Sequence, residues 1–131
     1  ISIEKFSEFA NIARENVHLN NLSNNIKVIT GNAMEIIPKQ KDLYFDLIYV
    51  DGDKGNYLEL TKLAEKKLSQ KGIILVDDIF FHGDSINEFP KTEKGQGCRA
   101  TIDYYSKSDK FYKYILPLNN GILLLKKKDS S

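Results

Sequence analysis

Acidic side chains directly follow two apolar runs, where a buried strand would give way to solvent. Residues 45–50 (FDLIYV) are followed by Asp51, and residues 73–76 (IILV) are followed by Asp77 and Asp78. Carboxylates that meet in a partly desolvated cleft cost stability unless a cation compensates them. Carboxylate oxygens are also the ligands that hard divalent metals prefer. The pattern therefore predicts a cation site, with Mg²⁺ as the expected ion and Mn²⁺ or Ca²⁺ as alternatives.

Two further charged residues belong to the same pattern. Glu4 ends a short strand-like run at the start of the chain, and Lys54 follows Asp51 by three positions. Ligands of an open parallel sheet bind outside the carboxyl ends of its strands, so these groups are expected at one edge. Each acid taken alone is equally well explained as a helix N-cap or a loop residue. Four carboxylates with a lysine beside them favour a site.

The elements that must position these residues alternate along the chain. The alternation predicts one α/β domain over residues 1–131, with a doubly wound, mostly parallel sheet and a C-terminal antiparallel hairpin. The region 82–97 is polar and reads as a long loop. Apolar spacing predicts helices at 6–17, 33–37 (closed by Pro38), 57–68 (stopped by Lys71-Gly72) and about 99–106, strands at 26–30, 45–50 and 73–76, and a hairpin of 112–118 and 122–125.

Composition excludes several classes of protein. A net charge of +1 gives no general attraction to nucleic acid or anionic lipid. No apolar run approaches the roughly 20 residues that span a bilayer, so no membrane partner is expected. Cys98 is the only cysteine, which rules out an internal disulfide and predicts a small packed side chain. With no signal segment, we expect a cytoplasmic protein.

A phosphoacceptor receiver domain is also small, doubly wound and lined with carboxylates. In that class the acidic pair follows the first strand and the single aspartate follows the third. Here the single Asp51 comes before the pair, and no lysine closes a later strand beside the site. The order argues against a receiver domain.

Four stretches together resemble one enzyme family, the cation-dependent class I O-methyltransferases of the catechol and caffeoyl-CoA type. "FDLIYVDGDKGNY" is similar to their "FDxxFxDxxKxxY", and "KGIILVDDIFFHG" to their "GGxxxxDNxxxxG". "GNAMEIIP" resembles "GDAxExLP", and "ILPLNNGILLLKKK" resembles "LPxxDGxxxxxK". The motifs occur in family order over nearly the whole chain. The resemblance implies a Rossmann-like methyltransferase fold that uses S-adenosylmethionine.

The resemblance also implies roles for individual residues. Asp51 and Asp77 correspond to metal ligands, with Asp51 bordering the cofactor as well, and Asp78 stands where the family usually has Asn. Lys54 occupies the place of the general base. The cofactor-binding positions are Glu4, which would hold the ribose hydroxyls, and Ala33, which would line the adenine; Asp53 falls at a variable position and is read as a loop residue.

The implied reaction is in-line methyl transfer to an oxygen that is an anion or nearly one. A divalent metal lowers the pKa of the acceptor hydroxyl, and Lys54, its own pKa lowered by the cation, takes the proton. Lys54 follows Gly52 in what reads as an exposed turn, so its replacement should leave stability nearly unchanged. The expected acceptor is a hydroxylated small molecule. A modified tRNA base is the alternative acceptor, and a non-catalytic α/β fragment or binding module is the alternative class.

Family members carry a helical N-terminal portion, a first strand and a glycine-rich turn before the segment seen here. We therefore expect this chain to be a C-terminal portion that is inactive alone, lacking that first strand and those helices. The full-length protein is expected to be a homodimer. In the polar loop, His82 is read as a bystander, and Lys91, Lys94 and Arg99 as solvated charges and not as contacts to an anionic acceptor.

Overall fold

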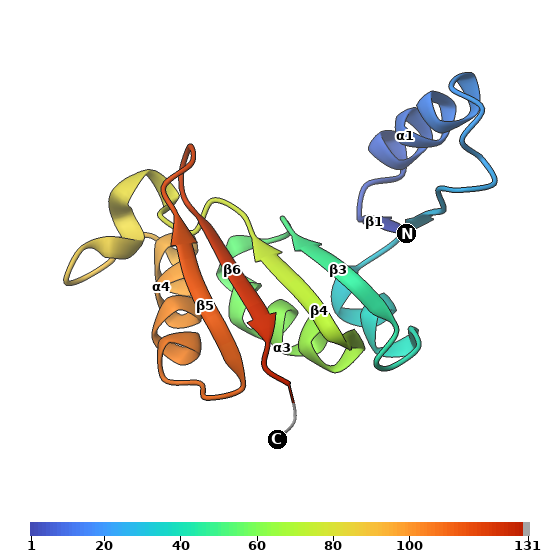
Figure 1. Ribbon diagram of the computed structural model, residues 1–131. Helices are drawn as coiled ribbons and strands as arrows, with labels where there is room; N and C mark the ends of the chain where they lie inside the picture. The colour runs from blue at the N-terminus through green and yellow to red at the C-terminus, as the bar shows by residue number, and fades with distance from the viewer. Residues whose placement is uncertain (130–131) are drawn as a thin grey trace. The chain divides into compact units, whose positions relative to one another are not determined.

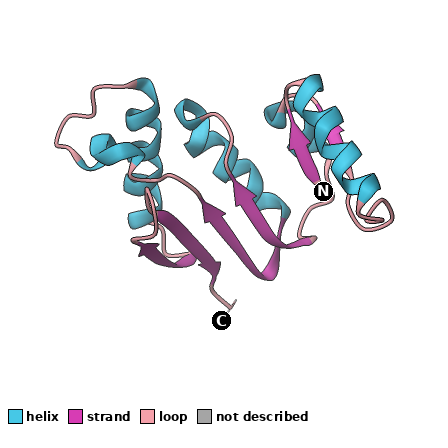
Figure 2. Ribbon diagram, turned by 90° about the horizontal axis from the view of Figure 1, so that it is seen from above, coloured by secondary structure: helices cyan, strands magenta, loops and turns pink. Residues whose placement is uncertain are grey.

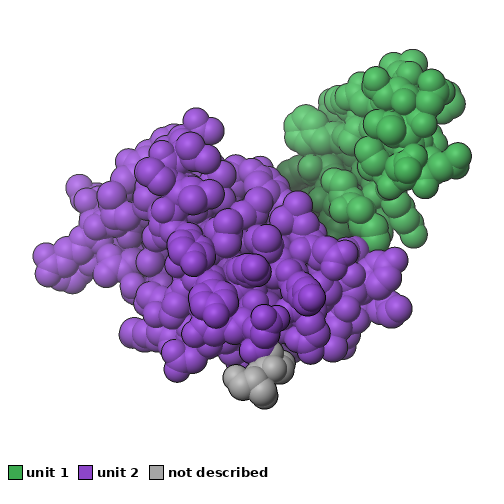
Figure 3. All heavy atoms as spheres, in the orientation of Figure 1, with its two compact units in different colours: residues 1–40 green, residues 41–131 purple. Residues whose placement is uncertain are grey.

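The computed structural model describes residues 1–129. They form two compact units, unit 1 (Ile1–Gln40) and unit 2 (Lys41–Ser131, described to residue 129). Figure 3 colours the two units separately. The prediction of a single domain stays a prediction, because the two units are distinguished only by their internal contacts.

Unit 1 is a small parallel strand pair with helices. Strand β1 (Ser2–Glu4) pairs in parallel with β2 (Val28–Thr30), and helix α1 (Ser7–Leu19) connects them. A short helix α2 (Ala33–Ile36) follows β2, and the 3₁₀ turn η1 (Ile37–Lys39) continues it. The α-helix ends just before Pro38, as predicted, and the chain continues as a 3₁₀ turn that contains the proline. Proline lies in the first turn of η1, where its missing N–H would have had no helical partner.

Unit 2 is a four-stranded sheet in the order β3-β4-β6-β5. Strand β3 (Phe45–Val50) runs parallel to β4 (Leu68–Val76). Strand β6 (Ile122–Lys127) is antiparallel to both β4 and β5 (Phe111–Leu116) (Figure 1). Parallel pairing followed by a closing antiparallel hairpin confirms the predicted α/β arrangement.

Helices α3 (Tyr57–Lys67) and α4 (Glu93–Ser106) lie on the same face of the unit 2 sheet (Figure 2). Strand side chains alternate between faces, so every second residue is available to pack under them. The buried strand residues follow that period, and the helices supply the other side of the core. The core includes Val50, Ile74, Val76, Leu123 and Leu125 of the strands, and Leu60, Ala64, Cys98, Thr101 and Tyr105 of the helices.

Strand β4 begins five residues earlier than predicted, directly after helix α3, which ends one residue earlier than predicted. Leu68 fits the apolar spacing of a helix, but its backbone is extended, and it is fully buried opposite Phe45. The pairing then skips, because Leu47 lies opposite Ile73. A Cβ at Gly72 would crowd Leu68 Cγ at 2.6 Å and the Phe45 carbonyl oxygen at 3.0 Å, so glycine suits this irregular stretch. Lys71-Gly72 therefore lies within a strand and does not stop a helix.

Helix α4 also begins earlier than predicted, at Glu93 and not near Arg99. Thr92 caps it, since its hydroxyl oxygen accepts from the Gly95 N–H at 2.9 Å. The first part of the remaining predicted loop forms the 3₁₀ turn η3 (Phe81–Ile86). Gly95 and Gly97 disfavour a helix by propensity, but both lie within α4 at points where other segments pass close to the helix.

The carboxylate of Asp84 ties η3 to the start of α4. Its oxygens accept from the Lys91 N–H at 2.9 Å and from the Thr92 N–H and hydroxyl at 3.0 and 2.7 Å. These hydrogen bonds lower the pKa of Asp84 to about 2. A Cβ at Gly95 would collide with this carboxylate, which explains one of the helix glycines.

We expect Asp84→Asn to lower the melting temperature near neutral pH, because the neutral amide accepts these hydrogen bonds less strongly. The folded pKa of Asp84 lies below its unfolded value of about 3.9. Its contribution is therefore present above that value and lost as pH falls through about 2. Thermal melts from pH 7 to pH 2 should show the difference between variant and wild type shrinking. Asp109→Asn, in an exposed turn, is the control, and a pH-independent difference would contradict the assignment.

Candidate functional site

Three aspartates meet at the carboxyl ends of the two parallel strands of unit 2. Asp51 follows β3, while Asp77 and Asp78 follow β4. The strands are held in register here by the Asp77 N–H, which donates to the Val50 carbonyl at 3.0 Å. Each aspartate offers a carboxylate oxygen, and the three oxygens lie within 4.8 Å of one another. We call these three residues the acid cluster.

Lys54 lies directly against the acid cluster. Its Nζ is 3.2 Å from Asp78 Oδ2 and 3.4 Å from Asp51 Oδ1. It opens the 3₁₀ turn η2 (Lys54–Asn56), which Asp53 caps by accepting from the Gly55 N–H at 3.2 Å. The prediction of an exposed turn is wrong for this side chain, which is only 13% exposed. The ion pairs and the packing of α4 hold it inward.

The charges of Lys54 and Asp78 stabilise each other. Burial lowers the pKa of Lys54, but the hydrogen bond and charge of Asp78, and then those of Asp51, outweigh it and raise the pKa above its ordinary value. Burial raises the pKa of Asp78, but hydrogen bonds from Lys54 and Asn120 outweigh it and lower the pKa. Both groups are therefore charged at neutral pH. A lowered Lys54 pKa in the presence of a cation stays a prediction.

The backbone at Asp78 is left-handed, with φ 50°, which is uncommon for a residue other than glycine. Its carbonyl accepts from the Phe81 N–H at 3.0 Å, and the Cys98 thiol of α4 lies 3.7 Å from it. The next residue, Ile79, donates its N–H to the Gly121 carbonyl at 3.0 Å. The hairpin turn and α4 thus hold this member of the acid cluster from two sides.

Helix α4 also supports the turn that carries Lys54. A Cβ on Gly97 would lie 2.8 Å from the Gly55 carbonyl oxygen and closer still to that of Lys54. Glycine at this position therefore lets the helix rest directly on the backbone of η2. Nothing in the local sequence identifies this contact, because it joins segments about forty residues apart.

Two tyrosines border the acid cluster, and neither is predicted from the sequence as a site residue. Tyr49 donates to the Asp77 carboxylate, and this hydrogen bond, with burial and the nearby acids, raises the pKa of Tyr49 to about 12. The alternation of β3 could have suggested it, since Tyr49 lies two residues before Asp51. Tyr57 is fully buried beneath Lys54, with its ring centroid 5.3 Å from Nζ.

Two of the three predicted cofactor-binding residues, Glu4 and Ala33, belong to unit 1, whereas Asp51 belongs to unit 2. Glu4 ends β1, and its Oε1 accepts from the Phe6 N–H at 2.8 Å. Its backbone carbonyl accepts from the Gly31 N–H, also at 2.8 Å, in the turn that leads to Ala33. Both residues thus lie close to the carboxyl ends of their strands. Their role in cofactor binding, alongside acids that belong to unit 2, stays a prediction.

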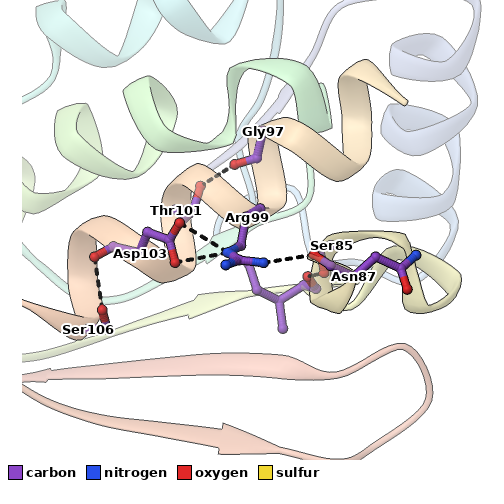
Figure 4. Close-up of polar contacts among 8 residues, drawn as sticks. Ser85, Asn87, Gly97, Arg99, Thr101, Asp103 and Ser106 are labelled. Atoms are coloured by element: carbon purple, nitrogen blue, oxygen red, sulfur yellow. Dashed lines mark hydrogen bonds and ion pairs between the residues drawn. The ribbon is translucent and has the colours of Figure 1, made fainter. Parts of the chain in front are cut away.

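Arg99 has a structural partner in the region predicted as a loop. Its Nε donates to both carboxylate oxygens of Asp103 at 3.0 Å, and its Nη1 donates to the Asn87 carbonyl at 2.9 Å. Figure 4 shows this side chain between α4 and the segment after η3. His82 is exposed beside Phe81, with ring centroids 5.4 Å apart. Neither residue belongs to the acid cluster, although the charge of His82 helps to lower the pKa of Asp78.

Comparison with known proteins identifies the family. The family model described as O-methyltransferase matches residues 1–128. The chain belongs to the O-methyltransferase family. Among curated relatives of this family, the "Probable caffeoyl-CoA O-methyltransferase 3" of Dictyostelium discoideum is 27% identical over 126 residues, covering 82% of this chain and 50% of that protein. The "Catechol O-methyltransferase" of Niastella koreensis is 29% identical over 103 residues, covering 76% and 46%.

A solved O-methyltransferase has the same fold. The O-methyltransferase from Bacillus cereus, crystallised with SAH, superposes with a TM-score of 0.86 at 25% identity. The match covers 96% of this chain and 61% of that one. The chain thus spans about half the length of the curated relatives it matches. Among residues 1–129, no helix is long and apolar enough to cross a membrane.

Proposed function

We propose that the natural protein carrying this chain is an S-adenosylmethionine-dependent O-methyltransferase that uses a divalent cation to methylate a hydroxyl of a small molecule. The acid cluster with Lys54 against it, at the carboxyl ends of β3 and β4, is the observation that carries the proposal. Relatives named for catechol and caffeoyl-CoA support the acceptor class, and the Bacillus cereus structure with SAH supports the cofactor.

The chemistry of the acid cluster suits a hard divalent cation. Its three carboxylates offer oxygen ligands within 4.8 Å of one another, and Asp51 is exposed enough to be reached from solvent. Mg²⁺ and Ca²⁺ prefer such ligands, and the first usually keeps several waters besides one or two carboxylates. Three carboxylates beside a single ammonium leave net negative charge, which a cation would compensate.

The bound cation and Lys54 would have separate parts in the proposed reaction. A bound cation would lower the pKa of the acceptor hydroxyl and fix its direction. Lys54 would receive the hydroxyl proton at Nζ, having first released its own. Compensation of Asp51 and Asp78 by a cation removes the attraction that raises the pKa of Lys54, so the ammonium gives up its proton more readily.

The residues of unit 1 would hold the cofactor. The Glu4 carboxylate would accept hydrogen bonds from the two ribose hydroxyls, and a charged acceptor binds these more strongly than an amide would. The turn that precedes Ala33 would lie along the adenine. These contacts leave the methyl-bearing sulfonium to be aligned with the acceptor, and alignment supplies a large part of the rate in such displacements.

We expect Asp51→Ala to weaken cation binding at least tenfold, because it removes one of the carboxylate ligands and leaves Lys54 paired with Asp78 alone. Calorimetric titration of the natural protein with Mg²⁺, Mn²⁺ and Ca²⁺ measures this. Asp46→Ala is the matched control, since Asp46 lies near the far end of β3, where its carboxylate accepts from the Ser69 hydroxyl at 2.7 Å. Negligible binding by wild type and Asp51→Ala alike would remove the cation from the proposal.

Methyl transfer itself is tested by incubating the natural protein with S-adenosylmethionine and a catechol-type acceptor. Product should form with Mg²⁺ and stop when a chelator is added. Turnover that persists in the presence of the chelator would show that the protein is an O-methyltransferase that does not depend on a metal. No turnover with any hydroxylated small molecule, but turnover on tRNA, would replace the acceptor class.

A further inference from the structure

Tyr57 carries a polar group that the proposed reaction does not use. It is the first residue of α3, and its side chain is fully buried. Its hydroxyl has no hydrogen-bond partner, and within the part of the chain that the structure describes it is the only buried side-chain nitrogen or oxygen of which this is true. Buried tyrosine hydroxyls normally have a partner, so this one calls for an explanation.

The hydroxyl lies within the field of the acid cluster. Burial is the main cause that raises the pKa of Tyr57, and the charge of Asp51 is the next. Cys98 and the other two members of the cluster contribute as well. The ring lies under the Lys54 ammonium, with 5.3 Å between Nζ and the ring centroid. Tyr57 is thus close to Lys54 and within electrostatic range of all three acids and of Cys98 in α4.

A neutral donor in this place has a property that Lys54 lacks. The ammonium of Lys54 compensates the carboxylates, but it repels any cation that binds them. A phenol hydroxyl can donate a hydrogen bond toward carboxylates without adding positive charge. Among residues 1–129 no group is a hydrogen-bond partner of this hydroxyl, so a link from it to the carboxylates would run through an ordered water; buried waters typically make about three hydrogen bonds.

We propose that Tyr57 is a positioning residue of the acid cluster. Its hydroxyl donates to an ordered water, and that water donates to the cluster carboxylates and fixes the direction in which their oxygens face a cation. The inference rests on the proposed function for the presence of the cation. Hydrogen-bonded groups behind metal ligands commonly change metal affinity by about 10- to 100-fold, although they never touch the metal.

The test is Tyr57→Phe, which keeps the ring and removes only the hydroxyl. We expect Mg²⁺ and Mn²⁺ affinity of the natural protein, measured by calorimetry, to fall about tenfold or more. The melting temperature without added cation should change little, because no protein group loses a hydrogen-bond partner when this hydroxyl is removed. A residue that only fills space would leave cation affinity unchanged, since phenylalanine fills the same space.

Tyr105→Phe is the matched control. Tyr105 is also fully buried, but its hydroxyl is 3.4 Å from Glu65 Oε2 and it is not part of the acid cluster. We expect this variant to lower the melting temperature and leave cation affinity unchanged, the reverse of Tyr57→Phe. Unchanged cation affinity in Tyr57→Phe, with wild type binding normally, would overturn the inference and leave the cation site standing. Absence of cation binding by wild type would overturn both.

Discussion

Lys54→Arg is expected to lower kcat for methyl transfer by about 100- to 10,000-fold, the usual contribution of a general base. Arginine keeps a positive charge beside Asp51 and Asp78, so cation affinity and melting temperature should stay close to those of wild type. Its guanidinium does not lose a proton in proteins, so it cannot accept one from the acceptor hydroxyl. Steady-state kinetics at saturating cofactor and cation measure the effect.

Lys54→Met separates the base from the charge. It should lose turnover to the same extent, but it also leaves the acid cluster without its ammonium. The melting temperature without cation should therefore fall, which replaces the sequence-based expectation of unchanged stability. Cation binding should then raise the melting temperature more than in wild type, because the folded state gains more from the ion. Full turnover by the arginine variant would mean that Lys54 supplies charge and not proton transfer.

Gly97→Ala is expected to destabilise the protein by about 1–3 kcal/mol, the range for overpacking a dense interior. Alanine in place of glycine within a helix gains about 1 kcal/mol from propensity, so the sign depends on the contact. Here the added Cβ meets two backbone carbonyl oxygens of η2, one of them at 2.8 Å, and backbone cannot move aside as a flexible side chain can. The steric cost should therefore exceed the gain in propensity.

Urea unfolding of Gly97→Ala beside Gly55→Ala measures this. A Cβ on Gly55, in η2, would also meet a residue of α4, but there the nearest atom belongs to the flexible side chain of Glu93, at 3.2 Å. We expect Gly55→Ala to cost less. If Gly97→Ala is as stable as wild type or more stable, the backbone of η2 can shift to accommodate the added Cβ. In that case α4 does not fix the position of Lys54.

Much of the fold follows from patterns that lie close together in the sequence. The apolar run before Asp51 forms β3, and the turn at Asn119–Gly121 joins the predicted hairpin. The convergence of the acid cluster could also be predicted, since the carboxyl ends of neighbouring parallel strands meet at one edge. These features depend on the spacing of apolar residues and on the order of the strands along the chain, both of which can be read from the sequence.

The features that the sequence does not reveal depend on contacts between distant segments. Glycines at 95 and 97 disfavour a helix by propensity, yet one faces the Asp84 carboxylate and the other faces η2. Leu68 fits the apolar spacing of a helix, but pairing with Phe45 makes it the first residue of β4. The burial of Lys54 likewise follows from ion pairs with acids on two strands.

The left-handed backbone at Asp78 limits which residues a lineage can place there. At φ 50°, Asn and Asp are the residues besides glycine that tolerate the conformation best. Of these three, only Asn and Asp carry a side-chain oxygen suited to a hard cation. Backbone shape and ligand chemistry therefore select the same two residues. Exchanging one for the other would change the charge of the acid cluster by one unit and leave the backbone as it is.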